Sequence, residues 1–487
     1  MNTALDNFKK ICSIPHGSGN EKALSDFLLG FAKDLGLKAI QDNALNLYIY
    51  KSASPGYENS TPIILQGHLD MVCEKDSSAP PDFDFEKDPL NIQIQDDFIF
   101  SQGTTLGADD AFALAYQMSI LEDSSLKHPP LCMLMTSEEE TGMAGVVALD
   151  PNLIKGHTLI NLDTDLEGEF LTSCAGGIRI NLTINGVKIS IPPGEALYDL
   201  KISGLKSGHS GAEIHKERAN ANVLMARVLD LLNEKFNIGL SSINGGQKDN
   251  VITKECLATI TISTDKYSAL SEYLKEIEKM LQLEYSVQDP DLTITLEPAS
   301  KEISAEENAT EDHEKFMIDS KLKIINLLRI LPNGVVAKSR HIENLVETSL
   351  NIGVVSTAKN VVSVTLLIRS SLESKKIDLK RKIKSIAKIM DIQYSENSDY
   401  PAWQFNEHSK IRAVAKDTYQ KFYNKEPVIK AIHAGLECGI LSEKIDNLDA
   451  ISLGPDVYDI HTSKERMNIS SFNRVYTFLI KLLEDMR

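Results

Sequence analysis

The pattern of apolar and polar residues predicts an α/β unit in the first 180 residues. Segment 20–36 places its apolar residues on one helical face and stops at Gly36. Between the helical segments lie short apolar runs with the length of buried strands, at 62–66, 131–136 and 158–162. Strands that alternate with helices in this way indicate a largely parallel sheet.

The middle of the chain, residues 181–395, repeats one order of elements. A strand, helix and strand are predicted at 255–263, 266–282 and 291–297, and again at 361–370, 377–390 and 391–395. A long apolar helix precedes each set, at 219–234 and 315–331. We therefore expect a lid-like α+β domain of two similar halves, joined by an exposed acidic linker at 302–314.

The last part of the chain, 396–487, returns to short strands and helices, among them 408–423 and 471–486. The simplest account is that this tail rejoins residues 1–180, so that 181–395 is an insertion. The inference depends on one distant residue, His461, which is taken up below.

Composition and charge narrow the possible partners. The chain has 51 Lys and Arg against 69 Asp and Glu, a formal net charge of −18. This balance argues against nucleic acid and against an anionic membrane surface, and it is compatible with carboxylates used to bind cations. The most apolar stretch, 111–121, is shorter than the roughly 20 residues that span a bilayer.

The N-terminus and the cysteines point to the cytoplasm. Residues 1–20 have the pattern of an amphipathic helix, with Leu5, Phe8 and Ile11 on one face, and not that of a signal peptide. Six cysteines are scattered without pair or cluster spacing. This distribution is typical of a reducing compartment and argues against a cysteine-based zinc site.

Two short motifs hold candidate metal ligands and also have plainer interpretations. His68 and Asp70 follow the strand at 62–66 and face the same way, so the carboxylate can orient the ring. A lone His-x-Asp is more often a surface or core histidine. In Gly107-Ala108-Asp109-Asp110, the glycine and paired acids suggest a tight loop, but an aspartate is also a common cap for the helix that follows.

The strongest local signal is the acidic run Glu138-Glu139-Glu140, directly after the strand at 131–136. Three carboxylates at a strand end are costly unless a cation neutralises them. Taken alone, the run is equally compatible with a solvated acidic helix start. Asp163 ends another apolar run, and His461 stands in a polar segment near the C-terminus. Together these histidines and carboxylates form a nitrogen and oxygen ligand set that suits zinc.

The order of these motifs resembles that of the di-zinc metallopeptidases of family M20, in the aminoacyl-histidine (cytosolic non-specific) dipeptidase branch. The matching stretches are QGHLDMV (66–72), TTLGADD (104–110), HPPLCMLMTSEEETGMAG (128–145), SCAGG (173–177), SGHSGAEIH (207–215), HAGLECG (433–439) and GPDVYDIHT (454–462). The resemblance covers nearly the whole chain. It implies a zinc-peptidase-like catalytic domain with a mixed, mostly parallel sheet (1–180 and 396–487) and a lid or dimerisation domain (181–395).

The resemblance also implies roles for single residues. His68 and Asp163 would bind one zinc ion and Glu140 and His461 the other, while Asp109 would bridge both through a cis peptide to Asp110. Asp70 would brace His68, and Glu139 would be the general acid and base. The family usually has Asp-Glu-Glu where this chain has Glu138-Glu139-Glu140, and the flanking Thr136 and Gly142-Met143 favour Glu139 as the base.

Residues of the middle domain would complete the site. His209 corresponds to the family's lid histidine, which stabilises the oxyanion, often from the other subunit of a dimer. Asn250 and Arg369 stand where the substrate's terminal carboxylate is held, and Gly435 and Glu437 where its amino end would lie. The implied enzyme is a cytoplasmic homodimer that hydrolyses dipeptides, of Xaa-His and broader type, with two Zn²⁺ per subunit that Co²⁺ or Mn²⁺ could replace.

Two other functions stay open at this stage. One is a related amidohydrolase of the family, a tripeptidase or an N-acyl amino acid deacylase, which Arg369 would serve equally well. The other is an inactive, zinc-stabilised binding protein, against which stands the presence of every expected ligand and of the base.

Overall fold

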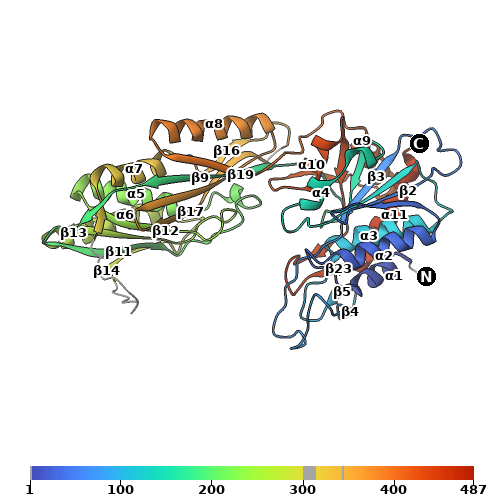
Figure 1. Ribbon diagram of the computed structural model, residues 1–487, viewed down its shortest axis with the longest axis horizontal. Helices are drawn as coiled ribbons and strands as arrows, with labels where there is room; N and C mark the ends of the chain where they lie inside the picture. The colour runs from blue at the N-terminus through green and yellow to red at the C-terminus, as the bar shows by residue number, and fades with distance from the viewer. Residues whose placement is uncertain (1–2, 300–313, 343–344) are drawn as a thin grey trace. The chain divides into compact units, whose positions relative to one another are not determined.

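The computed structural model describes residues 3–299, 314–342 and 345–487 (Figure 1). It divides into two compact units. Unit 1 consists of Met1–Cys174, Trp403–Ala431 and Leu436–Arg487, and unit 2 of Ala175–Ala402 and Ile432–Gly435. The segment Ile432–Gly435 therefore belongs to unit 2, although it lies inside the tail at 396–487. The acidic linker expected at 302–314 lies outside the described residues except for its last residue, Glu314.

The core of unit 1 is an eight-stranded sheet with four parallel strands at its centre. The strand order is β1-β2-β6-β3-β7-β21-β8-β20, and β6, β3, β7 and β21 pair in parallel. The three apolar runs of the sequence form β6, β3 and β7, which confirms those predictions. The strands are β1 Lys38–Gln41, β2 Leu47–Lys51, β3 Ile63–His68, β6 Leu131–Thr136, β7 Thr158–Asn161, β8 Glu169–Cys174, β20 Val428–Ile432 and β21 Asp449–Ser452.

Helices bury the faces of this sheet, and α3 is the most enclosed. Every residue of α3 except Glu122 is buried, as expected for a helix that is apolar on all sides. The N-terminal α1 and C-terminal α11 both pack against it. The helices of unit 1 are α1 Thr3–Cys12, α2 Lys22–Asp34, α3 Ala108–Glu122, α4 Ala144–Ala148, α9 Lys410–Tyr423, α10 Glu437–Lys444 and α11 Ile469–Asp485, with a 3₁₀ turn, η1, at Pro151–Leu153.

A second, small sheet ties the two ends of the chain together. Its order is β22-β23-β5-β4, so the C-terminal strand β23 pairs with β5, which comes from before residue 102. The C-terminal part of the chain thus completes the first α/β unit, as the sequence predicts. The strands are β4 Ile92–Gln95, β5 Phe98–Ser101, β22 Val457–Tyr458 and β23 Arg466–Asn468.

Unit 2 contains the repeated strand–helix–strand order that the sequence predicts, and both halves share one sheet. Its order is β14-β11-β13-β12-β17-β18-β9-β19, with β16 paired to β17. Figure 1 shows the helices of the unit along one side of the sheet. The elements are β9 Gly176–Asn185, β11 Glu195–Ser203, η2 Ile214–Lys216, α5 Ala221–Phe236, β12 Gly239–Gly245, β13 Cys256–Ser263, η3 Thr264–Lys266, α6 Tyr267–Glu284, β14 Thr293–Pro298, α7 Ile318–Ile330, β16 Gly334–Lys338, β17 Val346–Ala358, β18 Val361–Ser370, α8 Glu373–Ile389 and β19 Gln393–Tyr400, with a separate pair, β10 Lys188–Ser190 and β15 Glu314–Phe316.

Two further expectations of the sequence concern the cysteines and the membrane. All six cysteines are free thiols. Among the described residues, none of the helices combines the length and the apolarity that crossing a bilayer requires.

Candidate active site

The candidate ligands of unit 1 gather at the carboxyl ends of the parallel strands. His68 is the last residue of β3, Glu139 and Glu140 lie in the loop after β6, and Asp163 follows β7. The carboxyl ends of parallel strands meet at one edge of a sheet, where α/β proteins usually place their sites. Asp109 reaches the same place from the start of α3, and His461 from the segment after β22.

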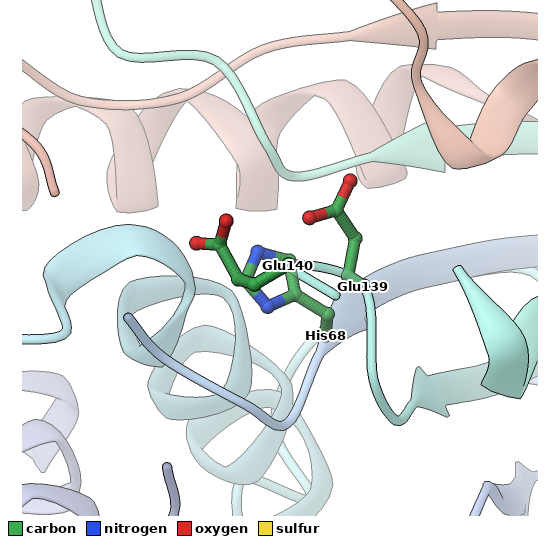
Figure 2. Close-up of side chains that lie close together, drawn as sticks. All are labelled: His68, Glu139 and Glu140. Carbon is green, nitrogen blue, oxygen red and sulfur yellow. The ribbon is translucent and has the colours of Figure 1, made fainter. Parts of the chain in front are cut away.

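The donor atoms of these residues form three overlapping groups. Within each group the ligand atoms lie within 4.8 Å of one another. One group is His68, Asp109 and Asp163; another is Asp109, Glu140 and His461; the third is His68, Glu139 and Glu140, which Figure 2 shows side by side. The first two groups share Asp109, so the side chains could hold two cations with one carboxylate between them.

Asp109 lies between two imidazoles. His68 Nε2 is 3.0 Å from its Oδ1, and His461 Nε2 is 3.2 Å from its Oδ2. His461 Nε2 is also 2.8 Å from Glu140 Oε1. Each histidine therefore faces a different oxygen of the same carboxylate. The peptide bond from Asp109 to Asp110 is cis, as the resemblance implies.

Burial and the density of acids shift the pKa values of the site strongly. Burial, with Asp109 nearby, raises the pKa of Asp163 well above its usual range. Burial and the acids around it, Glu437 first among them, raise the pKa of Glu139 to about 8. Hydrogen bonds to Asp109 and Glu140 raise the pKa of His461 to about 11. An array of acids that resists ionisation in this way is suited to a compensating cation.

Asp70 anchors other parts of the site in addition to the ring of His68. The ring nitrogen Nδ1 of His68 is 2.9 Å from the backbone oxygen of Asp70 and 3.5 Å from its carboxylate. The carboxylate itself accepts the backbone N–H groups of Glu139 (2.9 Å) and Glu140 (3.1 Å) and the hydroxyl of Ser18 (2.8 Å). One buried carboxylate thus positions His68 and the acidic loop together.

The strand end at His68 fits closely against the start of α3. The backbone N–H of His68 donates to Asp110 Oδ2 at 2.9 Å. A Cβ on the preceding Gly67 would lie 2.5 Å from that oxygen and 2.5 Å from the side chain of Ala113. Glycine is therefore required at position 67, because any side chain would separate the strand from the loop that carries Asp109.

The plainer interpretations of two motifs are wrong. Residues Glu138, Glu139 and Glu140 do not begin a helix, because α4 starts only at Ala144. Neither Asp109 nor Asp110 caps α3: the capping position is Gly107, with a left-handed backbone and no side-chain hydrogen bond.

Unit 2 brings together a second group of predicted residues. A Cβ placed on Gly211 would lie 3.0 Å from the His209 ring and 3.2 Å from Arg369 Nε, so both side chains converge there. Arg369 is buried and its Nη1 donates to Tyr400 at 2.9 Å, while its buried Nε has no hydrogen-bond partner among the described residues. Asn250 is adjacent, since its backbone oxygen accepts the N–H of Ser210.

His433 belongs to the same group, which we call the His209–Arg369 cluster, and sequence reasoning missed it. Its backbone oxygen would lie 2.4 Å from a Cβ on Gly211, and its ring donates to or accepts from Ser349 Oγ at 2.7 Å. Burial and Arg369 lower the pKa of His433 to about 3. Its signal was available, because it opens the HAGLECG motif. Ser18 was missed as well, and only its contact with Asp70 reveals it.

The remaining two predicted residues lie in different units. Gly435 lies in unit 2, and Glu437 at the first turn of α10 in unit 1. Glu437 is completely buried, and its Oε2 accepts hydrogen bonds from Gln66 (2.5 Å) and Thr136 (2.7 Å). Its Oε1 is buried and has no hydrogen-bond partner in the part of the chain that the structure describes.

The chain is similar to known proteins over nearly its whole length. Residues 200–289 match the model of the peptidase dimerisation domain of the M20 family. The chain is 36% identical over 481 residues to the cytosol non-specific dipeptidase of Escherichia coli K12, covering 99% of this chain and 97% of that protein. The crystal structure of aminoacylhistidine dipeptidase from Vibrio alginolyticus superposes with a TM-score of 0.91 at 34% identity, covering 99% of this chain and 96% of that one.

A more distant structure shows the fold alone. Aminopeptidase PepT from Bacillus cereus has a TM-score of 0.56 at 15% identity, with 99% of this chain and 98% of that chain covered. Sequence identity over nearly the full length, together with the convergence of acids and histidines at the sheet edge, leads to one conclusion: the chain belongs to the M20 family of metallopeptidases, in the branch of the cytosol non-specific and aminoacylhistidine dipeptidases.

Proposed function

We propose that this protein is a two-metal dipeptidase that cleaves the peptide bond by attack of water. The observation that carries the proposal is the position of Asp109, whose two oxygens face His68 and His461 separately. Two of the relatives described above are named as dipeptidases, and this supports the class of substrate.

The residues present fit a pair of zinc ions. His68 and Asp163 would hold one ion, Glu140 and His461 the other, and Asp109 both; these are the groups whose donor atoms lie within 4.8 Å of one another. Imidazole nitrogen and carboxylate oxygen are a ligand set that zinc accepts, and cobalt or manganese could replace it. Bound there, the metals would supply Lewis-acid polarisation of the scissile carbonyl and a lowered pKa for water.

Glu139 is the general base in this proposal. It lies within the group of His68 and Glu140, yet it belongs to neither of the groups that contain Asp109. Its carboxylate would accept a proton from the attacking water and deliver it to the leaving amine. Asp70 would position Glu139 through the hydrogen bond to its backbone N–H.

The His209–Arg369 cluster would bind the other end of the substrate and the developing negative charge. Arg369 offers a buried, unpaired Nε to a terminal carboxylate, with Asn250 beside it. Burial, with Arg369, lowers the pKa of His209, so its ring is neutral near pH 7 and can donate a single hydrogen bond to an oxyanion. A free carboxylate at a short distance from the scissile bond would favour dipeptides.

Three further points of the proposal concern the amino end, the assembly and the location. The buried Oε1 of Glu437 would accept a hydrogen bond from the substrate amino group, and the backbone of Gly435 would contact the same end. The match of residues 200–289 to a dimerisation domain supports a homodimer. In such a dimer His209 could act within its own subunit or across the subunits. The name of the Escherichia coli relative supports a cytoplasmic location.

The test is hydrolysis by metal-free protein reconstituted with zinc. A panel of Xaa-His dipeptides, other dipeptides, tripeptides and N-acetyl amino acids separates the dipeptidase from its family alternatives. We expect zinc-dependent cleavage of dipeptides and little cleavage of the other two classes. Faster cleavage of tripeptides or N-acetyl amino acids would overturn the assignment.

A further inference from the structure

Glu465 makes an unusual set of contacts four residues after His461. Its carboxylate accepts four consecutive backbone N–H groups from the loop that leads into α3. Oε2 accepts those of Leu106 (2.8 Å) and Gly107 (3.0 Å), and Oε1 those of Ala108 (2.8 Å) and Asp109 (3.4 Å). Glu465 lies 356 to 359 positions after these four residues in the sequence, so the contact is purely tertiary.

The loop is built to receive a carboxylate. Gly107 has a left-handed backbone (φ +65°), which turns successive N–H groups toward one point, and a Cβ there would lie 2.7 Å from Met71 Sδ. Consecutive N–H groups at such a turn form an anion-binding concavity. They are also the groups that a helix N-terminus leaves without partners, and no side chain of the loop itself caps α3.

Burial makes these contacts strong. Glu465 is 2% exposed, and Leu106, Gly107, Ala108 and Asp109 are all buried. Each of these buried N–H groups would be left without an acceptor if the carboxylate were lost, because water cannot replace it there. A loop held by four such bonds has little freedom to move.

The loop ends at the residue on which the candidate metal centre depends. Asp109 is itself one of the four donors, and its side chain lies between His68 and His461. His461 and Glu465 lie on one short segment that leads directly into β23, and β23 pairs with β5. Glu465 therefore links the segment that carries one histidine to the loop that carries the shared carboxylate.

We propose that Glu465 is a positioning residue for the metal centre, holding Asp109 at a fixed distance from His461 before any cation binds. The inference rests on the proposed function, since it takes Asp109 and His461 as metal ligands. Glu465 touches neither substrate nor cation; it acts through the backbone of the loop at 106–109.

The test measures zinc affinity directly, by competition with a chromogenic chelator, and metal content by mass spectrometry. Glu465→Gln keeps the shape of the side chain but places an amide N–H₂ against backbone N–H groups. Glu465→Asp keeps the charge and shortens the reach. The matched control is Asp289→Asn in unit 2, because Asp289 is also fully buried and accepts two backbone N–H groups, of Lys206 and Ala219, at 2.7 Å.

We expect Glu465→Gln to lose about 10–100-fold in zinc affinity, the usual effect of removing a group that orients a ligand. Glu465→Asp should lie between the parent and Glu465→Gln. Asp289→Asn should bind zinc as the parent does, even where its thermal stability falls. At saturating zinc, Glu465→Gln should lower kcat with a KM within about twofold of the parent's.

The outcomes distinguish a failure of the positioning role from a failure of the proposed function. Parental zinc affinity in Glu465→Gln would overturn the positioning role, whatever its effect on stability. Should that variant fail to fold, parental affinity in Glu465→Asp would overturn it equally. A parent protein that holds no metal would instead refute the proposed function on which the inference rests.

Discussion

The candidate metal site of unit 1 and the His209–Arg369 cluster of unit 2 shift the pKa of histidine in opposite directions. In unit 1, carboxylates surround the imidazoles, and hydrogen bonds to Asp109 and Glu140 raise the pKa of His461 to about 11. In unit 2, burial and a guanidinium surround them, and the pKa of His433 falls to about 3. The first environment attracts cations, and the second attracts an anion while keeping its histidines neutral.

The difference assigns separate tasks to the two groups. An acidic cluster with a raised carboxyl pKa can store protons and exchange them for metal ions. A neutral histidine next to an arginine whose Nε is buried and available can bind a carboxylate and an oxyanion without releasing a proton. The predictions below test whether these tasks are separable.

The largest effect is expected from the base. Glu139→Gln should keep the metal content and lower kcat by about 10²–10⁴, because it removes the proton acceptor and no proposed ligand. The measurement is steady-state turnover of a dipeptide beside metal analysis of the same sample. Glu138→Gln, one position earlier, is the control and should turn over nearly as the parent does. Parental turnover in Glu139→Gln would move the base to another residue.

The next effect tests the neutral histidine of unit 2. His209→Ala should lower kcat by about 10²–10³ with a much smaller rise in KM, as for a group that acts mainly on the transition state. Mixing this variant with Glu139→Gln under subunit exchange should restore part of the activity, because one hybrid site keeps both residues. If the mixture stays inactive although exchange is complete, His209 does not act across subunits.

A smaller effect is expected from the arginine. Arg369→Lys should lower kcat/KM for dipeptides by about tenfold or more, since an ammonium cannot reproduce the planar fork of the guanidinium. Zinc affinity should not change. The control is Arg179→Lys, because Arg179 lies on the same sheet as Arg369 and forms an ion pair with Asp249. A shift of zinc affinity in Arg369→Lys would show that the two groups are not independent.

The smallest effect concerns stability and pH in metal-free protein. Between pH 6.5 and 8 the folded chain holds protons on Glu139 and His461 that the unfolded chain has lost, because both pKa values are raised on folding. Stability should therefore fall as pH rises through this window. The lowered pKa of His433 acts only below pH 6.5, where it makes stability rise with pH. Thermal unfolding in a chelator checks both; a melting temperature that rises from pH 6.5 to 8 would contradict the assignment.

The fold was accessible from sequence where local patterns decide it. The apolar runs at 62–66, 131–136 and 158–162 became β3, β6 and β7 because buried parallel strands are apolar on both faces. The repeat in the middle of the chain was visible because each half has the same order of strand and helix patterns. The place of Ile432–Gly435 was not, because a four-residue excursion into unit 2 leaves no periodicity.

The site could be predicted from the sequence where its side chains belong to recognisable motifs. His68, Asp109, Glu140, Asp163 and His461 stand in recognisable motifs, and the structure brings their donor atoms together; their roles as ligands stay a prediction. Asp70 and Glu465 were harder, because both act on backbone N–H groups, which every residue carries. A carboxylate that binds backbone 356 positions away looks, in sequence, like any other acid.

The split of unit 1 across the chain has a consequence for the order of events during synthesis. Residues up to Cys174 carry four of the five proposed ligands, but β21 and His461 follow only after all of unit 2. A nascent chain therefore exposes an acidic half-site while more than two hundred residues of unit 2 are still being made. If His461 is one of the ligands, as proposed, the ligand set would be complete only after unit 2 has been made.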